Sequence, residues 1–156
     1  MKDSWRSVVR GRLWIVAVAL LAAGVALRFY GISTRLPWED EVYYFKRSVL
    51  DMPLTDAPLS TFLLRHFLLA TDTTFFNLYL FAALGGSAAL ISFLLLAREV
   101  SNRPEYLLGC LSFMAFSPVA VFYSQAGRPY GLLLFITPLV LLAFLRAYRR
   151  GSLWDW

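Results

Sequence analysis

Three consecutive carboxylates, Glu39, Asp40 and Glu41, are the residues of this chain best suited to chemistry. They follow shortly after the first long apolar run, where adjacent like charges repel one another and favour water. A carboxylate in a half-enclosed pocket at a membrane surface can act as a general base, or can hold a cation against a phosphate-bearing lipid. The more ordinary interpretation is a solvated acidic cap at the N-terminus of a short helix, where carboxylates favour the helix dipole. The residues alone leave both interpretations open.

A second polar cluster lies between two apolar runs further along the chain. Arg128 stands there beside a Ser-Gln pair and several aromatic residues, including Tyr123, Gln125 and Tyr130. An arginine at the bilayer boundary with such neighbours can grip a phosphate or hold a nearby carboxylate. The alternative is an arginine that reaches the headgroups from a tight turn between two helices.

Membrane helices are the elements that must position these two clusters. The chain has 156 residues, of which 59% are hydrophobic and 17% aromatic, a composition typical of a bilayer protein. A spanning helix needs roughly 17–25 mostly apolar residues. This predicts an all-α integral membrane protein with four transmembrane helices, at about residues 12–30, 75–98, 106–125 and 129–147. Pro118 and Pro138 are expected to kink the last two.

The segment 31–74 is predicted to be an external loop that contains two interfacial helices. Residues 41–50 carry apolar side chains at helical spacing, with Lys46 and Arg47 on the other side. Residues 59–70 are apolar too, but the segment is too short to cross a bilayer and contains Arg65 and His66. The whole chain, residues 1–156, is therefore expected to form a single transmembrane region.

The distribution of basic residues predicts the orientation in the membrane. The N-terminal segment, the 98–105 loop and the tail from Arg146 hold nine of the fifteen basic residues, which places them in the cytoplasm. Both termini are then cytoplasmic, and the two polar clusters share the extracytoplasmic face of the cell membrane. Because orientation accounts for the net charge of +5, nucleic acid is not expected as a partner.

Other chemical motifs give little signal. No Gly-rich phosphate loop, zinc pattern or nucleophile elbow appears, and the single Cys110 and single His66 do not indicate a metal site. The acidic triplet offers ligands for a divalent cation, but three adjacent residues do not converge on one ion without partners from elsewhere. No metal ligands or cofactor are therefore assigned, and a divalent cation stays open. The small residues 85–89 are expected to form a close contact between helices.

The order of these motifs resembles the N-terminal part of the GT-C fold glycosyltransferases that use polyprenyl-phosphate-linked sugars. This group includes the protein mannosyltransferases and the aminoarabinose transferases. The matching strings are Trp38-Glu39-Asp40-Glu41-Val42-Tyr43-Tyr44, Ala57-Pro58-Leu59, Ser117-Pro118 and Tyr123-Ser124-Gln125-Ala126-Gly127-Arg128-Pro129-Tyr130. The last string is the most specific, and the resemblance covers nearly the whole chain. The family commonly has a Glu where Ala126 stands, and often a His before the Pro-Leu, where this chain has Asp56-Ala57.

The resemblance implies an inverting transferase whose partners are a lipid-linked sugar donor and membrane lipid. Asp40 would be the catalytic carboxylate, with Glu41 beside it, and would deprotonate or orient the acceptor hydroxyl or amine. Arg128 would stabilise the charge that develops on the leaving phosphate. The neighbouring residues Tyr123, Gln125 and Tyr130 would bind substrate with it.

Two further hypotheses remain. GT-C enzymes have many more spans than four, so the chain is expected to be truncated relative to the family or to work with other membrane protein subunits. In the second case it would be a non-catalytic accessory subunit of a larger complex. The third hypothesis is a lipid-binding or transport component, in which the charged groups of the outer face hold a phospholipid headgroup.

Overall fold

The computed structural model is all-helical and describes residues 2–50 and 58–150, with side chains described for residues 13–50 and 58–149. The helices are α1 (Lys2–Phe29), α2 (Glu39–Val49), α3 (Pro58–Ala70), α4 (Phe75–Val100), α5 (Pro104–Phe116), α6 (Pro118–Gln125) and α7 (Tyr130–Arg150). Each predicted span and each predicted interfacial helix corresponds to one of these helices or to the α5–α6 pair.

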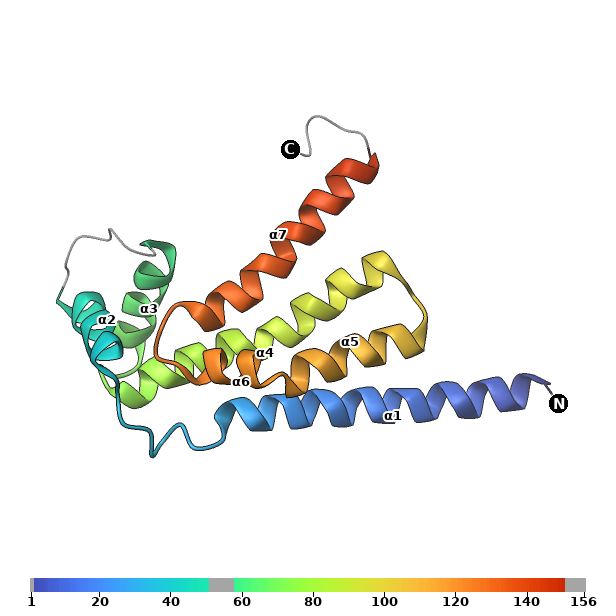
Figure 1. Cartoon of the computed structure of the whole chain (residues 1–156), viewed down its shortest axis with the longest axis horizontal. Coiled ribbons are helices and arrows are strands. Elements are labelled where there is room, and N and C mark those ends of the chain that lie inside the picture. The colour runs from blue at the N-terminus through green and yellow to red at the C-terminus, as the bar shows by residue number, and fades with distance from the viewer. Residues whose placement is uncertain (1, 51–57, 151–156) are drawn as a thin grey trace.

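The long helices run back and forth along one axis (Figure 1). The short helices α2 and α3 lie together at one end, beside the turn between α6 and α7. Helix α7 makes its most extensive contact with α4, and its C-terminal part diverges from the other helices. This arrangement brings the segments around residues 40 and 128 to the same end of the molecule.

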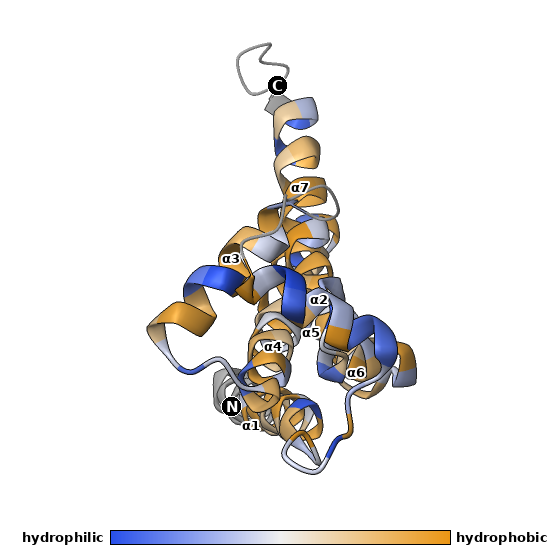
Figure 2. Ribbon diagram, turned by 90° about the vertical axis from the view of Figure 1, so that its left-hand side faces the viewer, coloured by the Kyte–Doolittle hydropathy of each residue, from blue (hydrophilic) through white to orange (hydrophobic). Residues whose placement is uncertain are grey.

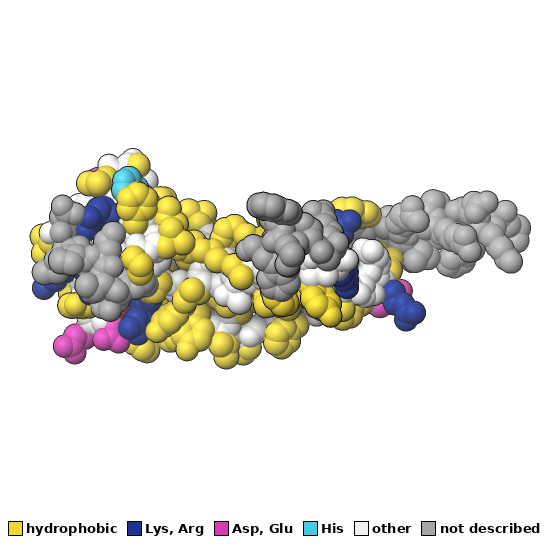
Figure 3. All heavy atoms as spheres, turned by 90° about the horizontal axis from the view of Figure 1, so that it is seen from above, with side chains coloured by type: hydrophobic (Ala, Val, Ile, Leu, Met, Phe, Trp, Pro, Cys, Tyr) yellow, Lys and Arg dark blue, Asp and Glu magenta, His cyan; other side chains and the backbone are white. Residues whose placement is uncertain are grey.

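The length and composition of the helices are consistent with a membrane protein. In the described residues, α4 and α7 are long and apolar enough to cross a membrane, and the bent α5–α6 pair is a third such unit if it counts as one span. Helix α4 has 26 residues, a length of about 39 Å, against about 30 Å for a hydrocarbon core. Hydrophobic side chains fill the middle of the face in Figure 3, and charged side chains gather toward both ends. The apolar part of α1, Leu13–Phe29, is shorter, so a fourth span stays a prediction.

The third predicted span is broken where Pro118 begins α6. Helices α5 and α6 meet at an angle of 50°, because proline cannot donate a backbone hydrogen bond and its ring clashes with the preceding turn. The buried Arg28 of α1 fills the break and donates to the carbonyl oxygens of Met114, at 3.0 Å, and of Gly24, at 2.7 Å. By contrast, α7 is assigned as one helix through Pro138.

Helix α2 buries a face that the apolar spacing did not predict. Arg47 was expected on the outer side, yet it is buried and donates to the hydroxyl of Tyr43 at 3.2 Å, whereas Val49 is exposed. The buried Tyr44 donates to Ser60 of α3 at 3.0 Å, and burial raises the pKa of the Tyr44 hydroxyl. The prediction for Arg47 was wrong because α2 packs on α3 through polar contacts. Figure 2 shows hydrophilic stretches of both helices at this end.

Glycines allow α4, α6 and α7 to approach closely. A Cβ at Gly85 would lie 2.9 Å from the carbonyl carbon of Gly131, and a Cβ at Gly131 would collide with the backbone oxygen of Ala82. A Cβ at Gly86 would collide with Ser124 of α6. The close helix contact predicted for residues 85–89 is confirmed.

Candidate functional site

The two polar clusters meet in one ion pair. Arg128 Nη1 lies 3.1 Å from Asp40 Oδ2, although the residues are far apart in sequence. The first turn of α2 carries Asp40, and the turn between α6 and α7 carries Arg128. Their side chains are 66% and 38% exposed, so the pair is accessible from solvent. Exposed ion pairs typically stabilise a fold by about 0–1 kcal/mol, and therefore these two groups can separate to meet a ligand.

Glu41 has a different environment from its neighbour Asp40. It is 2% exposed, and its Oε2 accepts hydrogen bonds from the backbone N–H of Trp38 and the hydroxyl of Tyr79, both at 3.0 Å. Its Oε1 accepts from the backbone N–H of Gly127 at 2.8 Å. These contacts join α2, α4 and the α6–α7 turn. Glu41 therefore fixes the distance between the segments that carry Asp40 and Arg128.

The guanidinium of Arg128 lies over one aromatic ring, which contacts a second. Its Cζ lies 5.3 Å from the centroid of the Tyr130 ring, within the range of a cation–π interaction. The Tyr130 and Tyr123 rings are in contact, with centroids 4.7 Å apart. Two of the three residues predicted to accompany Arg128 thus form a platform next to it.

Gln125, the third of them, contacts the end of α1. Its Nε2 donates to the carbonyl oxygens of Leu27, at 2.7 Å, and Tyr30, at 3.0 Å. The last carbonyl groups of a helix have no partner within the helix, and the Gln125 side chain supplies one. The structure therefore gives Gln125 a contact that ties α6 to α1.

Two residues near the ion pair were not singled out from the sequence. Arg35 adds a second cation to this face, with its Cζ 5.4 Å from the centroid of the Phe122 ring, and Trp38 packs against the same ring at 6.0 Å. Tyr79 lies in the first turns of an apolar helix, where its hydroxyl bonds Glu41. In each case the sequence offers only a polar group next to the acidic motif or near the end of a predicted span. Such groups are common in membrane proteins, so they have little specificity for a functional site.

The three acidic neighbours do not form a set of metal ligands. Glu41 is directed inward to three donors, and Asp40 pairs with Arg128. Among the residues that the structure describes, no three His, Cys, Asp or Glu side chains lie close enough together to hold an ion. Asp56-Ala57, where the resembling family often has a His, lies outside the described residues.

Comparisons of the chain with protein-family models, with curated proteins and with solved structures found no match. The geometry of Asp40 and Arg128 is therefore the basis for a functional conclusion. A carboxylate that can take a proton and a guanidinium that can bind a phosphate stand side by side, at one end of a membrane-protein fold.

Proposed function

We propose that this chain is a membrane glycosyltransferase, or the N-terminal part of one, that transfers a sugar from a polyprenyl-phosphate-linked donor to an acceptor at the extracytoplasmic face. The observation that carries the proposal is the exposed ion pair between Asp40 and Arg128. The proposal includes four spans, surface-lying α2 and α3, and cytoplasmic termini, as the charge distribution predicts. The sequence motifs of the GT-C glycosyltransferases support the same assignment.

In the proposed reaction Asp40 acts as the general base. Its carboxylate accepts the proton of the acceptor hydroxyl or amine while the acceptor atom forms a bond to the anomeric carbon of the sugar. The bond between that carbon and the phosphate oxygen breaks, and the lipid phosphate leaves with the electron pair. Arg128 binds this phosphate and stabilises its developing charge. The attack inverts the configuration at the anomeric carbon.

The surrounding residues prepare this arrangement. Glu41 holds α2 against the α6–α7 turn through Gly127, so it is a positioning residue. Tyr130 lies against the guanidinium and restricts its orientation. Arg128 must release Asp40 and bind the phosphate when the donor binds. Because the ion pair is exposed, breaking it requires little free energy.

The test is donor turnover in membranes that contain the full-length protein. Labelled polyprenyl-phosphate-linked mannose and aminoarabinose, the sugars of the groups that the sequence resembles, serve as donors, and released lipid phosphate is measured. We expect Asp40→Asn to lower the rate by about 10²-fold or more, the usual contribution of a positioned base. Glu39→Gln is the matched control, because Glu39 is the exposed neighbour in the same helical turn. Turnover that is unchanged in Asp40→Asn would overturn the proposal.

A non-catalytic accessory subunit is the alternative, and the position of α7 favours it. This helix diverges from the others, and its apolar residues Val140, Leu141 and Phe144 are exposed. Such a face packs against lipid or against another membrane subunit. Stoichiometric co-purification with unrelated subunits, without donor turnover, would support this alternative. A purified monomer with transferase activity would exclude it.

A further inference from the structure

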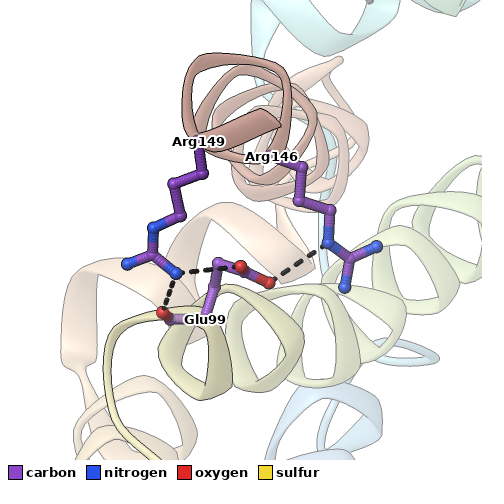
Figure 4. Close-up of polar contacts among 3 residues, drawn as sticks. All are labelled: Glu99, Arg146 and Arg149. Carbon is purple, nitrogen blue, oxygen red and sulfur yellow. Dashed lines mark hydrogen bonds and ion pairs between the residues drawn. The ribbon is translucent and has the colours of Figure 1, made fainter. Parts of the chain in front are cut away.

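A polar cavity lies at the C-terminal end of α4, whereas Asp40 of α2 lies near the N-terminal end of α4. Glu99 there accepts from two arginines of α7, with Arg146 Nε at 3.1 Å from Oε2 and Arg149 Nη1 at 2.9 Å from Oε1 (Figure 4). Arg149 also donates to the backbone oxygen of Glu99 at 2.7 Å. Arg98 and Asn102 complete the polar lining of a cavity of about 360 Å³. Three arginines against one glutamate leave this cavity with a net charge of +2.

An apolar groove adjoins this cavity. It has a volume of about 600 Å³ and lies between α1, α4 and α5, with Trp14, Ala17 and Leu108 among its walls. Arg98 and Asn102 line both the groove and the polar cavity. The two spaces therefore meet at these residues and together offer one long apolar surface with a basic end.

We infer that this junction binds an anionic glycerophospholipid, with an acyl chain in the groove and the phosphate at Arg98 and Asn102. Arg98 has no carboxylate partner among the residues whose side chains are described, whereas Arg146 and Arg149 share Glu99. A free phosphate would occupy only the polar cavity, and an uncharged chain only the groove. An anionic lipid uses both, and its charge complements the net positive charge.

The inference does not depend on glycosyl transfer. The junction lies beside the C-terminal end of α4, and the Asp40–Arg128 pair lies beside its N-terminal end. A phosphate at Arg98 would also lie near Arg146 and Arg149, which line the same cavity. Bound lipid would therefore connect the last turn of α4 with the C-terminal part of α7.

Lipid retention by the full-length protein tests the inference. The protein is equilibrated with vesicles of equimolar phosphatidylglycerol and phosphatidylcholine, extracted in mild detergent, and its bound lipids are counted by native mass spectrometry. We expect selective retention of phosphatidylglycerol, and a loss of about fivefold in Arg98→Gln, the effect of one basic residue at a lipid headgroup. Arg103→Gln is the matched control, because Arg103 is exposed at the same end and lines neither space. Ala17→Phe fills the groove and should also lower retention.

Three results would overturn the inference. Equal retention of the two lipids would exclude a site for an anionic headgroup. Equal losses in Arg98→Gln and Arg103→Gln would show general attraction to a basic surface. Displacement of the lipid by inorganic phosphate, with no effect of Ala17→Phe, would show a phosphate site without a groove for the chain. Unfolding temperatures equal to that of the parent protein verify that the variants are folded.

Discussion

Asp40 and Glu41 are neighbours in sequence with opposite environments. Successive residues of a helix are separated by about 100° around its axis, so the two carboxylates leave α2 in different directions. Asp40 reaches the exposed Arg128, whereas Glu41 is enclosed by donors from Trp38, Tyr79 and Gly127. One carboxylate is therefore free to exchange partners, and the other holds the segments around it.

At this scale we predict that Glu41→Gln destabilises the protein. The amide group keeps the size of the side chain but presents an NH₂ group where a donor now points, and it removes the charge from the remaining hydrogen bonds. Because hydrogen bonds to charged groups are worth about 1.5–3 kcal/mol each, the free energy of unfolding should fall by about 2–3 kcal/mol. Thermal unfolding in detergent measures the change. Glu39→Gln is the control, and equal unfolding temperatures for both variants would contradict the role of Glu41.

At the scale of the elements, single polar side chains complete the ends of helices. Arg28 fills the break between α5 and α6, and Gln125 satisfies the carbonyl groups at the end of α1. Arg65 of α3 donates to the backbone oxygen of Ser48 in α2 at 2.9 Å. The last carbonyl groups of a helix have no partner within that helix, and side chains from neighbouring helices supply one in these three places.

The contact of α4 with α7 gives a prediction about two glycines. Gly131→Ala would drive a Cβ into the backbone of Ala82, which cannot move without shifting α4. We expect a loss of about 1–3 kcal/mol in the free energy of unfolding, as for other overpacked sites. Gly109→Ala in α5 is the control, because a Cβ there has nothing within 4 Å, and alanine favours a helix by roughly 0.5–1 kcal/mol. Thermal unfolding should therefore change in opposite directions, and a shared direction would contradict the packing argument.

At the scale of the whole molecule, α7 is held by packing on α4 and by ion pairs near its end. Near its start, Gly131 packs on α4, and near its end Arg146 and Arg149 pair with Glu99. Between these places Leu142 is buried, whereas Val140, Leu141 and Phe144 are exposed. The C-terminal part of α7 is thus held by charged groups at its end together with the buried Leu142 and Ala147.

Glu99→Gln should loosen the C-terminal part of α7 while the packing near Gly131 persists. We expect faster hydrogen exchange in residues 143–149 and little change near residue 131. High salt should produce the same effect in the parent protein, because partly exposed ion pairs are screened. Hydrogen exchange with mass spectrometry measures both, and Glu105→Gln, an exposed glutamate of α5, is the control. Unchanged exchange in Glu99→Gln would show that these ion pairs do not hold α7.

The sequence by itself determined which segments are helical. The span predicted at 75–98 is α4 (Phe75–Val100), and the short segment predicted at 59–70 is α3 (Pro58–Ala70). The break at Pro118 was also predictable, because a proline cannot donate a backbone hydrogen bond and its ring clashes with the preceding turn, although α7 continues through Pro138. Apolar length and proline position are properties of the local chain, so they can be read without a partner.

Only the tertiary structure decided which polar side chains are buried and what they contact. Distant parts of the chain come together in the fold and give these side chains their environments. They pair Asp40 with Arg128, enclose Glu41 and bury Arg28 and Arg47. A charged residue in the sequence is compatible with water, with an ion pair or with the carbonyl groups of another helix. The choice among them depends on the neighbouring helix, because a buried charge is stable only where another segment supplies its partners.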